Sequence, residues 1–320
     1  MPSWAPISWN DISRMRGRWI LVAGGLASIL MPLLGPSTPL DQMTFRGGRA
    51  FEDLKRLVAL GPRPSGSAAL IKARQEIIRQ LKLTGVGVEE DSFTAATPLG
   101  TMPMSNLIAR VPGERQQTVI IAGHYETKRF DDFPFVGAND GGSSAAFLIE
   151  LGRVLSQRKN KLTYWLVFFD GEEAFIQFTG TDGLYGSRHL VQKLTASGEL
   201  SRIQAMILVD MIADAKLNIH REYNSTPWLT DKVFAAARRL GYQKYFQDEV
   251  RAYEDDHIPF VNAGVAAVDL LDFDYGPDNR YWHTAQDTID KCSPFSLTIV
   301  GRVVLGTLDD LESQPRAKQN

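Results

Sequence analysis

Residues 162–175 read LTYWLVFFDGEEAF, and this stretch decides the fold class of the chain. Its first eight residues are apolar, aromatic or β-branched, which is typical of a strand buried inside a sheet. Asp170, Glu172 and Glu173 follow at once, and apolar Ala174 and Phe175 come after them. Buried carboxylates are strongly disfavoured unless they bind a cation or accept hydrogen bonds. The stretch therefore predicts a buried strand that delivers acids to a functional site at its carboxyl end.

Helix and strand signals alternate on both sides of this stretch. Helices are expected over residues 48–60, 68–83, 142–155, 185–194, 229–240 and 295–311, and strands over 86–93, 106–111, 117–123, 162–169, 205–210 and 266–271. Such alternation indicates an α/β fold of three layers, in which a mostly parallel, mixed central sheet has helices on both faces. Ligands bind beyond the carboxyl ends of the strands in open α/β sheets. His124, residues 170–173 and Asp210 all fall at such ends.

Composition excludes some classes of function. The 320 residues are 44% hydrophobic and 22% charged, as in a globular protein with a sizeable core. The formal net charge of −2, without a basic cluster beyond the extreme N-terminus, argues against a nucleic-acid partner. Cys292 is the single cysteine, so an intrachain disulfide is impossible.

The N-terminus predicts membrane attachment. Arg14, Arg16 and Arg18 precede the apolar residues 19–35, as in a secretory signal or a signal anchor. These 17 residues are near the lower limit for a membrane-spanning helix, and no Ala-x-Ala cleavage site follows them. An uncleaved anchor with an extracytoplasmic (periplasmic or secreted-side) domain is therefore expected, although a buried N-terminal helix is the alternative. The expected organisation is an anchor and linker over residues 1–40 and one catalytic domain over residues 41–320.

Three polar residues together suggest a metal site. Asp140 lies in a Gly-rich turn before an expected helix, Glu173 follows the buried strand, and His283 lies in the segment YWHT at 281–284. Alone, Asp140 reads as a helix cap and His283 as a structural histidine. As a set, two oxygen ligands and one nitrogen ligand suit a catalytic zinc ion with an open fourth position. Glu172, next to a ligand, then becomes the natural general base.

Longer motifs carry a resemblance that covers about residues 50–311. They are GHYETK at 123–128, FVGAND at 135–140, FFDGEEAF at 168–175, LYGSRHL at 184–190, EDDHIPF at 254–260 and YWHT at 281–284. In this order they resemble the animal-type, zinc-dependent glutaminyl-peptide cyclotransferases, which are related to the zinc aminopeptidases with co-catalytic metals. The resemblance implies a zinc-peptidase-like fold and the conversion of N-terminal glutamine of peptides or proteins to pyroglutamate. It also implies one Zn²⁺ per chain, and we expect the chain to act as a monomer.

The resemblance also assigns roles to particular residues. It makes Asp140, Glu173 and His283 the zinc ligands, Glu172 the catalytic acid/base, Asp210 and Asp255 the acids that assist it, and Trp282 a wall of the substrate pocket. The residues alone do not rank Asp255 above Asp256. The chain departs from the family where Glu126 replaces Asp, Phe178 replaces a pocket Trp, and Glu254 replaces Gln, so that pocket shape and substrate preference are open.

Two other functions remain open from the sequence. A di-zinc aminopeptidase would use His124 and Asp210 for a second metal bridged by Asp140, with His124 otherwise a supporting residue. A membrane-tethered binding domain without catalysis is the other possibility, because fold does not fix function. A lost ligand or acid/base would be its expected sign, and Asp140, Glu172, Glu173 and His283 are all present.

Overall fold

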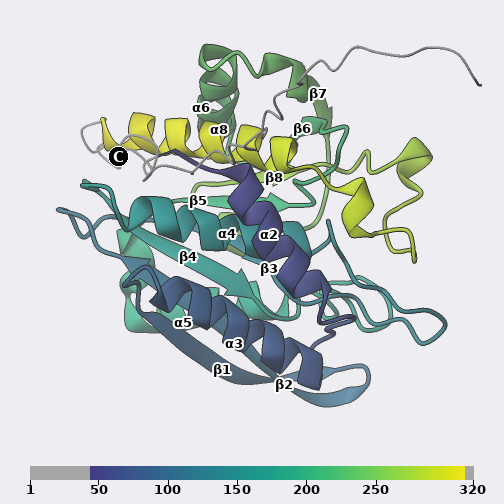
Figure 1. Ribbon diagram of the computed structural model, residues 1–320. Coiled ribbons are helices and arrows are strands. Elements are labelled where there is room, and N and C mark those ends of the chain that lie inside the picture. Colours follow the sequence, from purple (N-terminus) through teal and green to yellow (C-terminus); the bar gives the residue numbers. More distant parts are fainter. Residues whose placement is uncertain (1–43, 314–320) are drawn as a thin grey trace, which may run out of the picture. The chain divides into compact units, whose positions relative to one another are not determined.

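The protein is described here by a computed structural model over residues 44–313 (Figure 1). The predicted anchor at residues 19–35 and the predicted domain boundary at residue 40 lie outside this range. Within residues 44–313, none of the helices combines the length and the apolar character needed to cross a membrane.

A six-stranded mixed sheet organises the chain, as predicted. Across the sheet the order is β1 (Val88–Thr97), β2 (Gly100–Val111), β4 (Thr163–Phe169), β3 (Thr118–His124), β5 (Ile203–Asp210) and β8 (Ala267–Leu271). The pairs β1–β2 and β2–β4 are antiparallel, whereas β4–β3, β3–β5 and β5–β8 are parallel. A separate two-stranded sheet pairs β6 (Ile219–Glu222) with β7 (Phe246–Arg251).

The parallel strands end level with one another. His124 at the end of β3 pairs with Phe169 at the end of β4, and Asp210 at the end of β5 pairs with Leu271 at the end of β8. The polar residues that end these strands, or follow them directly, therefore reach one edge of the sheet.

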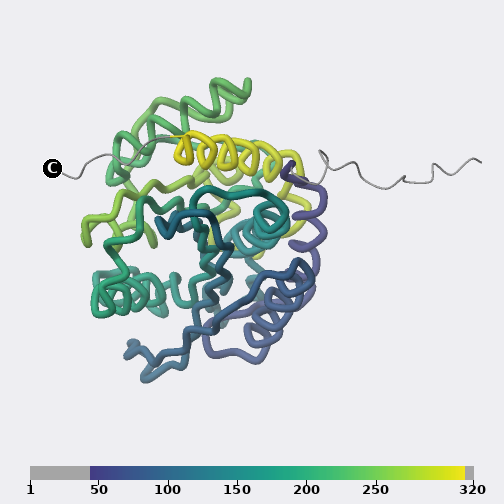
Figure 2. Tube along the Cα trace, turned by 90° about the vertical axis from the view of Figure 1, so that its left-hand side faces the viewer, coloured from purple at the N-terminus to yellow at the C-terminus, as the bar shows by residue number. Residues whose placement is uncertain are grey.

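Helices cover both faces of the sheet (Figures 1 and 2). One face packs against a layer that contains α2 (Gly47–Val58), α3 (Ala68–Lys82), α4 (Gly142–Leu155), α6 (Pro227–Arg239) and α8 (Pro294–Glu312). The other packs against α5 (Tyr185–Ser197) and α7 (His257–Asn262). Side chains of β3 alternate between the layers: Ile121 belongs to the first core and Ile120 to the second. The three-layer α/β prediction is confirmed.

Helix α4 is the central helix, with all its residues buried. Its bounds coincide with the prediction. It carries two buried charges, Glu150 and Arg153, and both pair with helix α2. Arg49 lies 2.6 Å from Glu150, and Asp53 forms a bidentate ion pair with Arg153. These pairs satisfy charges that would otherwise be strongly disfavoured inside the protein.

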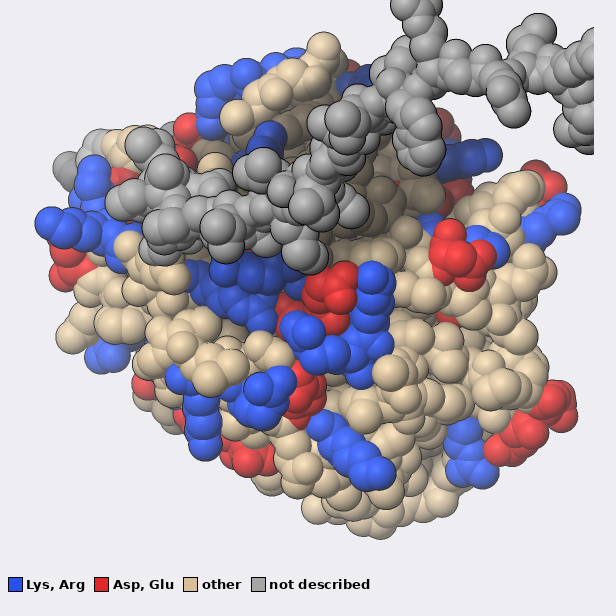
Figure 3. All heavy atoms as spheres, in the orientation of Figure 1, with Lys and Arg blue, Asp and Glu red and all other residues tan. Residues whose placement is uncertain are grey.

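The face that carries α2 and α3 mixes charges of both signs (Figure 3). Lys55 lies 2.7 Å from Glu52, and Arg79 lies 2.7 Å from Glu76. Pairing of this kind offsets the positive charge of the two helices locally.

The β1–β2 hairpin and the segment between β5 and β8 differ from the prediction. Strand β2 begins at Gly100 rather than at residue 106, although Pro103 argues against a central strand. Pro103 is tolerated because β4 pairs only with residues 107–111 of β2, so that an edge of the hairpin stays open there. Strands β6 and β7 and helix α7 were not predicted, because elements of four to six residues show too little periodicity.

Candidate active site

A cavity of about 460 Å³ opens at the edge where the parallel strands end. Its walls include all of the residues predicted to catalyse, to hold a metal or to bind substrate, namely Asp140, Glu172, Glu173, Phe178, Asp210, Glu254, Asp255, Trp282 and His283. His124 lies behind this wall, buried at the end of β3. The structure thus brings together residues that span almost 150 positions of the chain.

The three predicted ligands converge in the cavity. His283 Nε2 lies 3.0 Å from Glu173 Oε1 and 3.3 Å from Asp140 Oδ2. Their ligand atoms all lie within 4.8 Å of one another, and Asp140 Oδ2 has no hydrogen-bond partner. An imidazole nitrogen and two carboxylates that face one common point can hold a metal ion.

Each of these predicted ligands comes from a different loop. Asp140 ends the turn before α4, where Gly141 adopts a φ of +75° and a Cβ would lie 2.2 Å from Glu126 O. Glu173 follows β4. His283 lies in the loop before α8 with a φ of +54°, a left-handed conformation that is unusual for a residue other than glycine.

Electrostatics favour a cation at this point. Burial alone would lower the pKa of His283, but the carboxylates of Glu173 and Asp140 outweigh it and raise the pKa to about 9. Burial acts to raise the pKa of Asp140, and the adjacent imidazoles of His124 and His283 nevertheless hold it below its usual range. The carboxylates of Asp140 and Glu173 thus favour a positive charge beside them, which a metal ion would supply.

Glu172 is in a different environment from its neighbour Glu173. Burial, reinforced by the adjacent charge of Glu173, raises the pKa of Glu172 well above its usual value. Its carboxylate lies near His124 and Glu126, whereas Glu173 faces His283 and Lys128, whose Nζ is 3.4 Å from Oε2. Its raised pKa and its separate surroundings make Glu172 the candidate for proton exchange.

Two more acids complete the polar wall. Burial raises the pKa of Asp210, whose Oδ1 lies 3.1 Å from His124 Nε2. Burial and repulsion from Asp269, Asp210 and Asp256 raise the pKa of Asp255 well above its usual value, and its Oδ2 has no hydrogen-bond partner. Asp255 lines the cavity and Asp256 does not. The structure therefore separates two neighbours that the residues alone could not rank.

Aromatic rings also line the cavity. Trp282 stacks on His283 with ring centroids 3.9 Å apart, and Phe273 meets Trp282 edge-on at 4.8 Å. Phe178 and exposed Glu254 also line the cavity. Phe273 was not predicted, because one aromatic residue within a loop carries no sequence signal.

A second cluster of possible ligands lies beside the first. His124 Nε2 is 3.1 Å from both Asp140 Oδ1 and Asp210 Oδ1. Asp140 therefore belongs to both groups, with one oxygen directed to each. This is the arrangement that a metal pair bridged by Asp140 would require.

Three buried residues shape the site in ways that the sequence did not predict. Glu126 Oε1 accepts hydrogen bonds from the backbone N–H groups of Glu172 (2.6 Å) and Glu173 (3.2 Å), and so orients their turn. Arg63, fully buried, donates to the carbonyls of residues 125, 136 and 137. Asp287 accepts hydrogen bonds from the turn that bears Asp140. Their partners are backbone groups distant in sequence, which no motif reveals.

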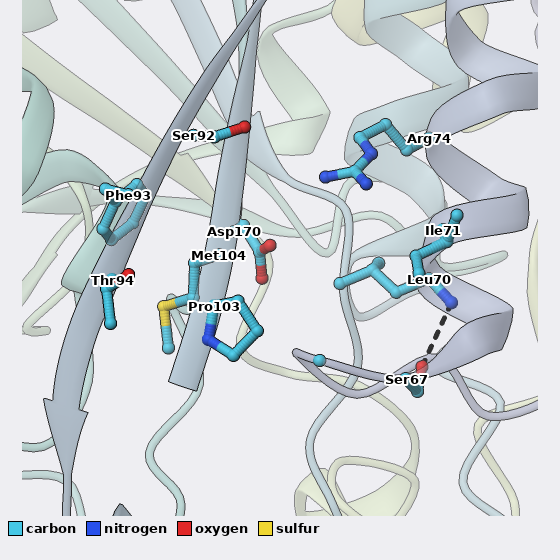
Figure 4. Close-up of a pocket in the computed structure, with 11 residues that line it drawn as sticks. Ser67, Leu70, Ile71, Arg74, Ser92, Phe93, Thr94, Pro103, Met104 and Asp170 are labelled. Atoms are coloured by element: carbon cyan, nitrogen blue, oxygen red, sulfur yellow. Dashed lines mark hydrogen bonds between the residues drawn. The ribbon is translucent and has the colours of Figure 1, made fainter. Parts of the chain in front are cut away.

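Another cavity of about 370 Å³ lies between α3 and the β1–β2 hairpin (Figure 4). Asp170 reaches it, but both carboxylate oxygens are bonded, to Ser65 Oγ at 2.5 Å and to the N–H of Ser105 at 2.8 Å. Asp170 therefore anchors the 170–173 turn from behind, with both of its carboxylate oxygens already engaged.

Comparison with known proteins shows the family of the chain. Residues 106–308 match peptidase family M28. The chain is 32% identical over 260 residues to a glutaminyl-peptide cyclotransferase of Gloydius blomhoffii, covering 69% of this chain and 70% of the relative. It is 30% identical over 278 residues to that of Boiga dendrophila, covering 75% and 74%.

Solved structures give the same result. A glutaminyl cyclase from an Acidobacteriales bacterium superposes with a TM-score of 0.82 at 42% identity, over 85% of this chain and 96% of that one. A leucine aminopeptidase precursor from Bacteroides thetaiotaomicron shares the fold, with a TM-score of 0.76 at 24% identity, over 85% and 98%. The chain belongs to peptidase family M28 and, within it, to the glutaminyl-peptide cyclotransferases.

Proposed function

We propose that the chain is a zinc-dependent glutaminyl-peptide cyclotransferase that converts N-terminal glutamine of peptides or proteins to pyroglutamate and releases ammonia. One observation carries the proposal. Glu172, a carboxyl group with a raised pKa, lies beside a two-carboxylate, one-imidazole cluster in an aromatic-walled cavity. Membership of the cyclotransferase family agrees with it.

Asp140, Glu173 and His283 are the proposed ligands of one zinc ion. Three nitrogen and oxygen ligands from the protein leave the fourth position of a catalytic zinc ion open for substrate. The convergence of their ligand atoms within 4.8 Å and the unpartnered Asp140 Oδ2 fit such an ion. When bound, zinc polarises the γ-carbonyl of the substrate glutamine.

Glu172 transfers the proton. As the α-amine nitrogen bonds to the γ-carbonyl carbon, ionised Glu172 takes a proton from the amine. It returns this proton to the amide nitrogen as the carbon–nitrogen bond breaks, so ammonia leaves and Glu172 is regenerated. A carboxyl group with a raised pKa suits both steps, because it accepts a proton more readily than an ordinary carboxylate and can pass it on to the leaving nitrogen.

The other cavity residues hold the substrate. Asp255 presents its unpartnered Oδ2 to the substrate amine or amide, supported by the buried acid Asp210. Trp282 and Phe178 pack on the curled glutamine side chain, and Glu254 contributes to the rim. Because nucleophile and carbonyl belong to one molecule, holding the chain curled is a large part of catalysis.

A substrate with a matched control tests this proposal. A peptide that begins with glutamine should lose ammonia and gain an N-terminal pyroglutamate, as followed by mass spectrometry. The same peptide with an acetylated α-amine lacks the nucleophile and should stay unchanged. Release of free glutamine from the first peptide would instead indicate hydrolysis.

The second candidate function is a di-zinc aminopeptidase. The observation that favours it is the cluster of His124, Asp140 and Asp210, in which His124 Nε2 is 3.1 Å from each carboxylate. An aminopeptidase would activate water between two metals rather than the substrate amine. A non-catalytic binding domain has no such observation in its favour, because Glu172 and all three proposed ligands are present.

We also propose that residues 19–35 anchor a monomeric catalytic domain outside the cytoplasm, because Arg14, Arg16 and Arg18 precede an apolar run. Protease added to intact spheroplasts should then digest the domain. Protection of the domain until the cells are lysed would contradict this placement.

A further inference from the structure

The carboxylate of Asp287 joins two loops that carry proposed zinc ligands. Asp287 lies four residues after His283, in the same loop. Its Oδ1 accepts a hydrogen bond from the N–H of Asn139 at 2.8 Å, and its Oδ2 accepts one from the N–H of Asp140 at 3.1 Å. With 1% of its surface exposed, Asp287 makes these bonds away from water.

Tyr275 supplies the third hydrogen bond to this carboxylate. Its hydroxyl donates to Asp287 Oδ1 at 2.7 Å. Tyr275 is fully buried, and its ring meets that of Tyr281 edge-on at 5.4 Å. The tyrosine therefore holds Asp287 from the early part of the loop that reaches His283.

The turn that carries Asp140 is held from its other side by Arg63. The guanidinium donates to the carbonyls of Val136 (2.5 Å) and Gly137 (2.9 Å), whereas Asp287 accepts from the N–H groups of Asn139 and Asp140. Arg63 thus donates to carbonyl groups of the turn, and Asp287 accepts from its N–H groups. The glycines of this turn, with φ of +48° at 137 and +75° at 141, do not fix the chain by themselves.

We propose that Asp287 is a positioning residue of the zinc site, which sets the spacing between Asp140 and His283. The inference rests on the proposed ligand set, and it goes beyond it because Asp287 touches neither zinc nor substrate. Hydrogen bonds that orient metal ligands commonly affect metal affinity 10- to 100-fold, because a displaced ligand no longer reaches the ion. Removing the hydrogen bonds between Asp287 and the turn of Asp140 should therefore weaken zinc binding, and not only lower the stability of the metal-free protein.

The chain contains a matched control at the other end of strand β4. Glu312, at the end of α8, also accepts hydrogen bonds from two consecutive backbone N–H groups, those of residues 161 (2.9 Å) and 162 (3.4 Å). It also accepts one from a tyrosine hydroxyl, that of Tyr164, at 2.6 Å. These partners lie around the start of β4, whereas the site follows its end. Glu312 thus has the same kinds of partner as Asp287 without the link to the ligands.

The test compares Asp287→Asn, Tyr275→Phe and Glu312→Gln in the full-length protein. Zinc affinity is measured by competition with a chromophoric chelator, and stability by thermal unfolding of the metal-free protein. Asn cannot accept from both N–H groups, so Asp287→Asn should bind zinc roughly 10- to 100-fold more weakly. Tyr275→Phe should weaken zinc binding about fivefold, the scale of one hydrogen bond. Glu312→Gln should lower the melting temperature and leave zinc affinity unchanged.

Excess zinc provides a further readout. At saturating zinc, Asp287→Asn should regain much of the parent kcat with an unchanged KM for a glutaminyl peptide. Parent-like zinc affinity in Asp287→Asn would overturn the inference, as would equal weakening in Glu312→Gln. Zinc affinity is measured without turnover, so the inference can hold even if the protein forms no pyroglutamate, and that result would reject only the proposed function.

Discussion

Glu172→Gln is expected to keep zinc and bind a glutaminyl peptide, while kcat falls by roughly a hundredfold or more. Glutamine preserves the shape and most hydrogen-bonding capacity of Glu172, but it cannot accept the proton of the α-amine. The raised pKa of Glu172 is the feature that suits it to this transfer. Steady-state kinetics together with zinc analysis of the purified variant measure the two effects separately.

Glu173→Gln is the matched variant, because it makes the same change one residue later. It removes the charge of a proposed zinc ligand that lies 3.0 Å from His283 Nε2, so zinc affinity and turnover should fall together. Added zinc should restore part of the rate. Loss of zinc in Glu172→Gln with retention in Glu173→Gln would reverse the assignment, and full activity of both variants would place the active site elsewhere.

Arg63→Met is expected to lower the free energy of unfolding by about 4 kcal/mol. Burial lowers the pKa of Arg63 to about 10, so the guanidinium stays charged at neutral pH. Its loss leaves the buried carbonyls of residues 125 and 137, and the partly buried carbonyl of residue 136, without these donors. Urea denaturation, with signal followed by fluorescence, measures the change.

Arg188→Met is the control for this prediction. Arg188 also donates to two backbone carbonyls, those of Gly180 and Thr181, but at the protein surface where water can replace it. Its substitution should cost less than about 1 kcal/mol. If both variants lost the same free energy of unfolding, the buried position of the Arg63 hydrogen bonds would add nothing to stability.

The sequence predicted the residues whose signals are local. Glu172 and Glu173 stand out because acids directly after a buried strand have few explanations other than a site. Asp140 and His283 were weaker candidates, and their grouping depended on the rule that parallel strands end at one edge. The structure follows that rule, because the last residues of neighbouring parallel strands pair with each other, His124 with Phe169 and Asp210 with Leu271.

The sequence could not predict residues that act through the backbone of another loop. The sequence assigned no role to Arg63 or to Asp287. Asp287 meets Asp140 across 147 positions, through an N–H group that every residue except proline has. The sequence also could not show which of Asp255 and Asp256 faces the cavity. The two residues directly precede α7, a helix of six residues that is too short to predict, and only Asp255 lines the cavity.

The most direct test of the account is a zinc titration of the metal-free, full-length protein with two substrates assayed in parallel. One is a glutaminyl peptide, followed by pyroglutamate formation, and the other is a leucyl anilide, followed by anilide hydrolysis. We expect cyclisation to reach its maximum at about one zinc per chain, with the anilide uncleaved. Hydrolysis of the anilide that needs two zinc ions per chain, without pyroglutamate formation, would contradict the account and establish the aminopeptidase instead.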